Sequence, residues 1–106
     1  MISYEEFKKL DIRIGKILKA ERIEGVDKLL RLEVDLGSEV RQIVAGIAQF
    51  YEPENLVGKE IPILANLEPR ILRGVESQGM LLAADNMGQP VIISPDNEIP
   101  PGSIVK

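Results

Sequence analysis

The clearest pattern in this chain is the strict alternation of apolar and charged residues over 30–36 (LRLEVDL). A period of two predicts a strand with one face against a core and the other face in solvent. Gly37-Ser38 follows and is typical of a hairpin turn. Val40–Ala45 then predicts a partner strand on the far side of that turn.

A longer apolar stretch, Ile12–Ile23, precedes this hairpin and predicts one long strand. Ile14, Leu18 and Ala20 share a parity, so we expect them on one buried face. Gly15 predicts a bulge or a sharp coil, because a glycine inside a strand marks a local bend. A strand that bends in the middle can serve two sides of a small closed barrel.

The N-terminus carries the signals of a short helix. Ser3 is followed three residues later by Glu6, which is a capping box. Ile2 and Phe7 are spaced as a hydrophobic staple around that cap. We therefore predict a helix over Tyr4–Leu10, whose apolar face plugs the end of a core or meets a partner.

The second half of the chain predicts three more elements. Ala48–Glu52 has the composition of a short helical piece that Pro53 ends. Ile61–Leu67 alternates as a fourth strand, and Pro62 within it indicates an edge position. Gly79–Ala84 is a continuous apolar run, which predicts a fifth strand buried on both faces.

Five strands with a short helix between the third and the fourth follow the order of an OB-fold barrel. We therefore predict an all-β fold: a five-stranded OB-fold barrel with a short N-terminal helix and a C-terminal extension. One domain then covers 1–106, with the helix in 1–10, the barrel in 11–84 and the extension in 85–106. The extension is rich in turns, yet it holds apolar residues that either cover the barrel or, as we favour, pair with a second copy (Val91, Ile92, Ile93, Ile99, Ile104 and Val105).

The composition excludes several functions. The 106 residues are 44% hydrophobic and include no cysteine and no histidine, which removes thiolate chemistry and the commonest metal ligand and general base. Ser77 does not have the spacing of a nucleophile elbow. We expect no catalytic, cofactor or metal site. No apolar run reaches the roughly 18 residues of a membrane helix, and no signal peptide is evident, so we expect a cytoplasmic protein without membrane contact.

The segment over 66–83 (NLEPRILRGVESQGMLLA) holds the strongest candidate chemistry. Arg70 and Arg73 are three residues apart, and Gly74 allows the backbone to turn beside them. Guanidinium groups on a loop at a rigid sheet edge suit contact with phosphate or RNA. The alternative is a surface loop whose arginines are only solvated.

The charge and the aromatic residues restrict the kind of RNA that we expect this chain to bind. The formal net charge of −4 counts against generic nucleic-acid binding, although residues 8–22 hold six cations against two acids. The adjacent aromatic residues Phe50 and Tyr51 are expected in the core beneath the barrel. Base stacking on strand aromatics is therefore disfavoured. Recognition of folded RNA by shape and phosphate remains.

Four ordered segments resemble one known family. Asp11–Ile17 resembles its opening strand D-I-R-V-G-x-I, and Val26–Asp35 resembles its A-D-K-L…V-D segment. Arg41–Ile47 resembles R-x-I-V-[SA]-G-I. Asn66–Met80 resembles N-L-x-P-[RK]-K-[ML]-R-G-x-x-S-x-G-M, with Ile71 where the family often has lysine. This family is the tRNA-binding domain attached to methionyl-tRNA synthetases, which also occurs as a free-standing protein.

The resemblance implies an OB-fold that binds tRNA by structure, with little dependence on sequence and no catalysis of its own. It also implies a homodimer built partly by the extension, and a methionyl-tRNA synthetase catalytic subunit as a further partner. We assign phosphate contacts to Arg70 and Arg73. Asn66 and Ser77 are expected to order the loop or to contact sugar hydroxyls, and Lys28 and Arg41 to enlarge the cationic surface. The full candidate set is Arg13, Lys28, Arg41, Asn66, Arg70, Arg73 and Ser77. The alternative function is a protein-interaction module, which docks a synthetase subunit or acts as an export chaperone of the CsaA type.

Overall fold

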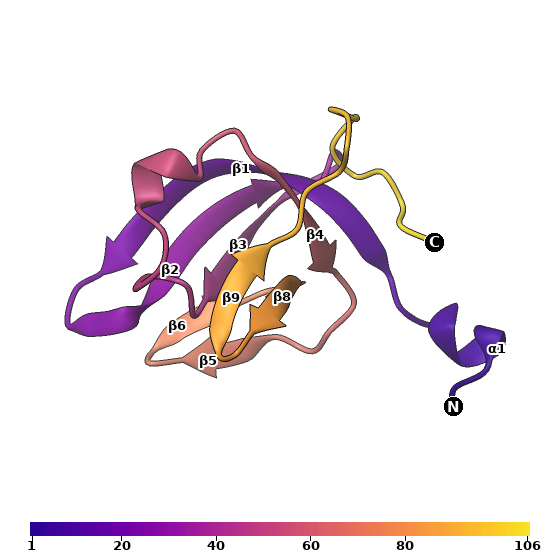
Figure 1. Cartoon of the computed structure of the whole chain (residues 1–106), viewed down its shortest axis with the longest axis horizontal. Helices are drawn as coiled ribbons and strands as arrows, with labels where there is room; N and C mark the ends of the chain where they lie inside the picture. Colours follow the sequence, from indigo (N-terminus) through magenta and orange to yellow (C-terminus); the bar gives the residue numbers. More distant parts are fainter.

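The computed structural model describes all residues, 1–106, and is built around one long curved strand (Figure 1). The elements in chain order are α1 (Tyr4–Phe7), β1 (Ile12–Ile23), β2 (Val26–Asp35), β3 (Val40–Ala45), the 3-10 helix η1 (Pro53–Asn55), β4 (Glu60–Leu64), β5 (Arg70–Leu72), β6 (Val75–Ser77), β7 (Met80–Leu81), β8 (Ala83–Asn86) and β9 (Gln89–Ile92). One five-stranded sheet has the order β3-β2-β1-β4-β7, and β5–β6 and β8–β9 are separate hairpins. The all-β, OB-like class is confirmed, with a short helix between the third and fourth strands.

β1 organises the sheet because it pairs with two different strands. Its N-terminal residues pair with β4 and the remainder pairs with β2, so the strand bends and serves two sides, as predicted. The prediction of a bulge at Gly15 was wrong, because the extra residue is Leu18, between Ile17 and Lys19. This insertion shifts the alternation by one position. Ile17, before the insertion, is fully buried, whereas Leu18, expected inside, is 46% exposed, and the shift then brings Ala20 against the core.

Gly15 instead allows β1 to pack closely against the core. A Cβ atom at this position would lie 2.3 Å from Val34 Cγ1 and 3.0 Å from Leu36 Cδ2. Both of those side chains belong to the core. The absence of a side chain at Gly15 therefore lets β1 cross directly over them.

The core lies between the curved sheet and the segment that links β3 to β4. Tyr51 packs against this core, and its hydroxyl accepts a hydrogen bond from the Ile92 N–H at 3.1 Å. Phe50 is 45% exposed, so its predicted place in the core was wrong. The buried cluster consists of Ile17, Leu30, Leu32, Val34, Leu36, Ile43, Ala45, Ile47, Ala48, Leu56, Ile61, Ile63 and Ala65.

The short helix is displaced from its predicted position. Residues 48–50 form a turn, in which the Phe50 and Tyr51 N–H groups both donate to the Ile47 carbonyl. The helix η1 then begins at Pro53, which was expected to end it. Proline suits a first helical position, since its φ is already helical and no helical partner is available there for an N–H.

Pro62 lies in an internal strand, so the predicted edge position was wrong. β4 is flanked by β1 and β7. Pro62 faces Ile14, whose N–H and carbonyl both bond to the C-terminal segment and not to β4. The missing proline N–H therefore points toward β7, where only the Pro62 carbonyl is used, by the Leu82 N–H at 3.0 Å. The one bond that proline cannot make is the reciprocal bond to the Leu82 carbonyl, which lies just past the end of β7.

The predicted fifth strand, Gly79–Ala84, is interrupted. It is divided between β7 and the start of β8, and Met80 is 41% exposed, so burial on both faces was wrong. Gly79 has a φ of 147°, and a Cβ atom there would lie 3.0 Å from the Leu64 carbonyl oxygen. The break lets the chain leave the sheet and form the β8–β9 hairpin.

The two ends of the sheet, β3 and β7, are not paired as strands, so the sheet does not close by strand pairing. Hydrogen bonds to side chains, together with one bond between backbone groups, span the interval. Gln42 donates its N–H to Gln78 Oε1 at 3.0 Å and accepts from the Gln78 N–H at 2.8 Å. The Val44 N–H donates to Ser77 Oγ at 3.0 Å.

The C-terminal extension covers the free edge of β1. The Ile14 N–H donates to the Ser103 carbonyl at 2.9 Å, and the Val105 N–H donates to the Ile12 carbonyl at 2.8 Å. The extension therefore covers the sheet within one chain, which was the first of the two predicted alternatives. Ile104 remains 58% exposed and available for other contacts.

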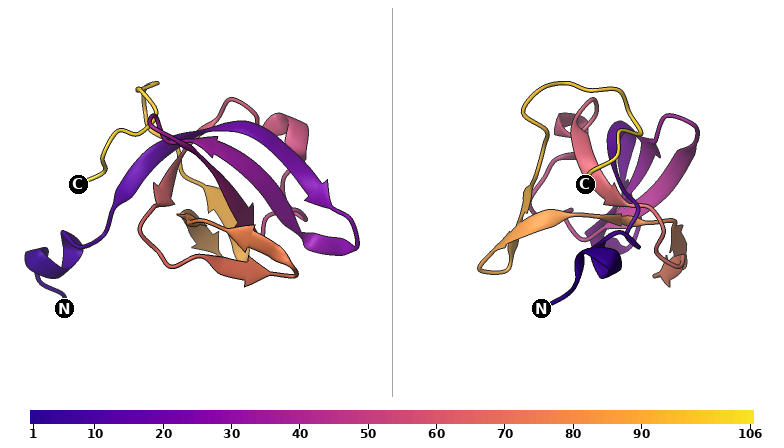
Figure 2. Two further views of the ribbon diagram at one scale, coloured as in Figure 1. Left: turned by 180° about the vertical axis from the view of Figure 1, so that it is seen from behind. Right: turned by 90° about the vertical axis from the view of Figure 1, so that its right-hand side faces the viewer.

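The helix α1 lies outside the sheet at one end of the molecule (Figure 2). The predicted capping box is confirmed, since Ser3 Oγ accepts from the Glu6 N–H and Glu6 Oε1 accepts from the Ser3 N–H. The helix ends at Phe7, earlier than predicted, and none of its residues is buried, so it does not plug the core. None of the helices has the length and apolarity needed to cross a membrane.

We expect Gly15→Ala to lower the free energy of unfolding by about 1–3 kcal/mol, because the added methyl group overpacks the side chains of Val34 and Leu36. The measurement is urea unfolding. Gly46→Ala is the matched control, because no heavy atom lies within 4 Å of its Cβ position. Equal unfolding midpoints for the two variants would contradict the packing role of Gly15.

We expect Ser77→Ala to cost about 1–3 kcal/mol of stability, because the buried Val44 N–H and the Gly79 carbonyl both lose their partner. Hydrogen exchange at the Val44 amide should accelerate in the same variant. Ser94→Ala removes an exposed hydroxyl without a hydrogen-bond partner and serves as the control. An unchanged exchange rate at Val44 would show that Ser77 does not hold β6 against β3.

Candidate nucleic-acid interface

The segment expected to be an arginine loop is a β-hairpin. β5 and β6 pair from Arg70 with Ser77 to Leu72 with Val75, which leaves a two-residue turn. The turn residues Arg73 and Gly74 have φ values of 52° and 83°. Positive φ at both central positions is what a type I′ turn requires. This geometry places the Arg73 side chain at the hairpin tip.

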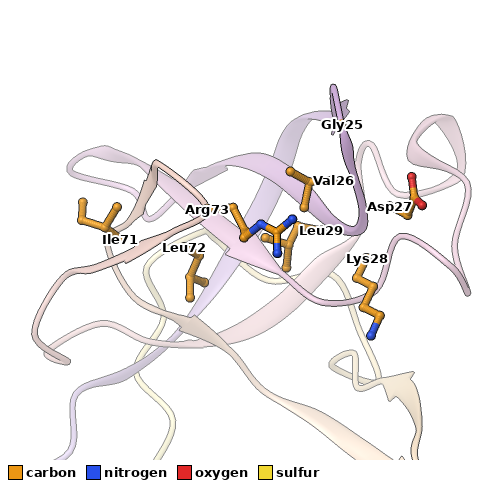
Figure 3. Close-up of a pocket in the computed structure, with 8 residues that line it drawn as sticks. All are labelled: Gly25, Val26, Asp27, Lys28, Leu29, Ile71, Leu72 and Arg73. Carbon is orange, nitrogen blue, oxygen red and sulfur yellow. The ribbon is translucent and has the colours of Figure 1, made fainter.

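The hairpin lies beside the β1–β2 turn, toward the end of the molecule away from α1 and the C-terminus (Figures 1 and 2). Between them is a groove of about 490 Å³ (Figure 3). The Arg73 guanidinium lies near Val26 and Leu29, whereas the Asp27 and Lys28 side chains extend away from it. We call this the hairpin groove; its lining residues are Gly25, Val26, Asp27, Lys28, Leu29, Ile71, Leu72 and Arg73.

Arg70 lines a second groove, of about 420 Å³, on the other side of the hairpin. Its walls are mostly apolar and come from the end of β3 and from residues 80–83. Leu72 lines both grooves, so the two adjoin. Arg70 and Arg73 therefore flank one short strand, with one arginine at each groove.

Ser77 and Asn66 have structural partners. Ser77 is buried, accepts from the Val44 N–H and donates to the Gly79 carbonyl at 2.9 Å. Asn66 accepts from the Asp11 N–H at 2.8 Å and donates to the Lys9 carbonyl at 2.7 Å. Ser77 thus orders the backbone at the base of the hairpin, and Asn66 fixes the residues before β1 against the segment that leads into the hairpin.

Arg13 and Arg41 are also engaged within the chain. Arg13 makes a two-bond ion pair with Asp11 at 2.9 and 3.0 Å, and that hydrogen-bonded carboxylate raises the pKa of the guanidinium. Arg41 bonds to Glu39 and to carbonyl oxygens of residues 65 and 78. Its hydrogen bond lowers the pKa of Glu39. Neither guanidinium lines the two grooves at the hairpin.

The ion pairs divide the cations into two groups. Four of the six cations in the basic stretch 8–22 are paired with acids, so that stretch is largely neutralised. Lys28, Arg70 and Arg73 form no ion pair, and all three are exposed. Glu68 and Glu76 lie in the same region but do not pair with either arginine. Across the chain, the cations without an acidic partner within 4.0 Å are Lys9, Lys16, Lys28, Lys59, Arg70, Arg73 and Lys106.

The sequence pattern did not indicate the apolar part of this candidate interface. Ile71 is 66% exposed and Leu72 is half-buried, and both line the hairpin groove. A signal for the hairpin was present, because Arg73-Gly74 between two short β-prone segments is a spacing typical of a two-residue hairpin turn. The side-chain bonds of Gln42 and Gln78 left no such local signal.

Known proteins are similar to this chain in both sequence and fold. The family model described as "Putative tRNA binding domain" matches residues 12–104. The methionine–tRNA ligase of Methanothrix thermoacetophila is 59% identical over 102 residues, which are 96% of this chain and 15% of that protein. The methionine–tRNA ligase of Archaeoglobus fulgidus is 53% identical over 104 residues, 98% of this chain and 16% of that protein. The chain thus spans about 15% of the length of these relatives.

Two crystal structures of similar proteins cover this chain completely. A MetRS related protein from Pyrococcus horikoshii superposes with a TM-score of 0.95 and is 41% identical, over 100% of this chain and 98% of that one. The chaperone CsaA from Bacillus anthracis superposes with a TM-score of 0.93 and is 33% identical, over 100% and 99% of the two chains. With its sequence and its fold both matched over nearly the whole length, the chain belongs to the tRNA-binding domain family found in methionine–tRNA ligases.

Proposed function

We propose that this domain binds folded tRNA through its sugar–phosphate backbone and serves as a non-catalytic accessory module of a methionyl-type aminoacyl-tRNA synthetase in the cytoplasm. The observation that carries the proposal is the group of three unpaired cations, Lys28, Arg70 and Arg73, around the β5–β6 hairpin. The family match provides the class of ligand.

The position of these cations suits a phosphate backbone. Arg70 and Arg73 project from a hairpin, and Lys28 lies across the hairpin groove from it. Guanidinium groups without an acidic partner can form two hydrogen bonds with a phosphate at no cost in broken ion pairs. The net charge of −4 limits binding elsewhere on the surface, so contacts concentrate at this end.

The aromatic residues favour recognition of tRNA by its shape. The Tyr51 ring packs against the core and its hydroxyl accepts from the Ile92 N–H, and Phe50 lies outside the strands. The sheet therefore offers no aromatic platform for a run of stacked bases. Folded RNA presents phosphates and 2′-hydroxyls on its outside, and these suit cations on a projecting hairpin.

The role of Arg13, Arg41, Asn66 and Ser77 in this proposal is indirect. Ser77 and Arg41 hold the base of the hairpin, whereas Asn66 and Arg13 are bonded to the segment before β1. The three unpaired cations contact the RNA. The extension would help to form a homodimer, in which two such hairpins act together and raise the effective affinity. The catalytic subunit of the synthetase is a further partner of the assembled module.

A second candidate function is the binding of protein segments, as in a chaperone. It is favoured by the similarity to the chaperone CsaA from Bacillus anthracis. The apolar groove beside Arg70 and the exposed Ile71 and Met80 are compatible with a peptide. Binding of unfolded polypeptide in the absence of any tRNA affinity would support this function over the first.

We expect the double variant Arg70→Ala/Arg73→Asn to weaken tRNA binding about ten- to a hundredfold at low salt, because two charged contacts are lost. The slope of log affinity against log salt should fall by about two. Asparagine at residue 73 tolerates the positive φ of the turn, so the hairpin is retained. Affinity is measured by filter binding or fluorescence anisotropy over a salt series.

The matched control is Lys9→Ala/Lys106→Ala. It removes two unpaired cations at the other end of the molecule (Figure 1). We expect it to leave the affinity and the salt slope nearly unchanged. An equal loss of affinity in both double variants would remove the hairpin from the proposal.

We expect the chain to sediment at twice the mass of one copy, and Ile104→Glu to shift it to one copy. A charge on this side chain, which is 58% exposed in one copy, stays in solvent in the monomer but would be buried at high cost in a dimer interface. Val57→Glu places the same charge on an apolar residue that is 52% exposed elsewhere, and it should not change the mass. A single-copy mass for the unaltered chain would rule out the homodimer.

A further inference from the structure

We propose that the hairpin groove holds one unpaired nucleobase of the bound RNA, sandwiched between its apolar wall and the Arg73 guanidinium. This inference rests on the proposed function, because it assumes that RNA reaches the β5–β6 hairpin. It adds a base contact to an interface that would otherwise touch only sugar and phosphate.

The groove has an apolar wall that the fold itself does not require. Ile71 is 66% exposed on the hairpin, and Val26 and Leu29 across the groove are only half-buried. None of these three side chains belongs to the buried core cluster. Isolated exposed apolar residues are common, but here they converge from two segments more than 40 residues apart in sequence on one concavity.

A planar cationic group lies over this wall. Figure 3 shows the Arg73 guanidinium near Val26 and Leu29. It has no ion pair and no hydrogen bond within the chain, so it is available to a ligand. The Asp27 carboxylate, the one acid lining the groove, is directed away from it. A guanidinium plane stacks on a base as an aromatic ring does, while keeping its charge near the adjoining phosphate.

The mouth of the groove is open to a ligand. Gly25 and Gly74, on the two turns that flank it, have no heavy atom within 4 Å of their Cβ positions. The volume of about 490 Å³ falls within the usual range for a small-molecule site. Paired bases are stacked inside a helix and cannot enter such a concavity. The occupant must therefore be an unpaired base, from a loop of the tRNA or from its single-stranded end.

The decisive variant is Arg73→Lys. Lysine keeps the positive charge and meets the same conformational demand at a φ of 52°, but it lacks the plane. We expect it to bind intact tRNA about five- to tenfold more weakly than the unaltered chain, with an unchanged salt slope, because a stacking contact is lost and no phosphate contact is lost.

A second variant tests the part of the apolar wall that lies on the hairpin. Ile71→Thr keeps the β-branched shape that suits the strand and places a hydroxyl in the groove. It should weaken tRNA binding by a similar factor without changing the salt slope. Because Ile71 is largely exposed, the urea midpoint should stay within error of the unaltered chain, so a loss of binding cannot be attributed to unfolding.

Three RNAs separate the outcomes: an intact tRNA transcript, the same transcript without its unpaired 3′-terminal nucleotides, and a fully paired RNA duplex of similar length. A penalty for Arg73→Lys on both tRNAs but not on the duplex supports a loop base. A penalty on the intact transcript alone supports the single-stranded end.

An equal affinity of Arg73→Lys and the unaltered chain for every RNA would overturn the base contact, and so would a penalty of the same size on the duplex. Either result leaves the proposed phosphate contacts standing. Those contacts fail separately if Arg70→Ala/Arg73→Asn keeps the full salt slope.

Discussion

The position of the β5–β6 hairpin depends on side-chain hydrogen bonds that span the two ends of the open sheet. The Gln42 N–H donates to Gln78 Oε1, the Gln42 carbonyl accepts from the Gln78 N–H, and Ser77 Oγ accepts from the Val44 N–H. These bonds are buried or half-buried, where an unsatisfied partner is costly. They fix where the hairpin meets β3, and thereby fix the hairpin groove and the orientation of Arg73.

The sequence predicted elements that depend on local pattern. The bounds of β1 and β3, the capped α1 and the alternation in β2 all followed from periodicity or from a cap within a few residues. The errors arose where distant segments decide. The bulge at Leu18 depends on pairing with β2, and Pro62 is accommodated in β4 because its register with Ile14 turns its nitrogen away from β1.

The candidate site was predictable in kind but less so in detail. Residue type identified seven candidates, but only the fold separates those with intrachain partners from those without. The pairing of Arg13 with Asp11 spans two residues and could have been anticipated. The bonds from Arg41 to the carbonyl groups at 65 and 78 could not, because they join segments that pattern leaves independent. Acidic neighbours and backbone carbonyl groups within the chain thus decide which candidate cations remain without a partner.

The pairing of the extension with the outer side of β1 has a consequence for solubility. Without residues 102–105, the Ile14 N–H and the carbonyl groups of Ile12 and Ile14 would form an unprotected strand edge with apolar side chains on it. Such an edge is a template for adding foreign strands and so for aggregation. The extension covers this edge and so prevents aggregation through it, while the opposite end of this small anionic domain carries cations without acidic partners.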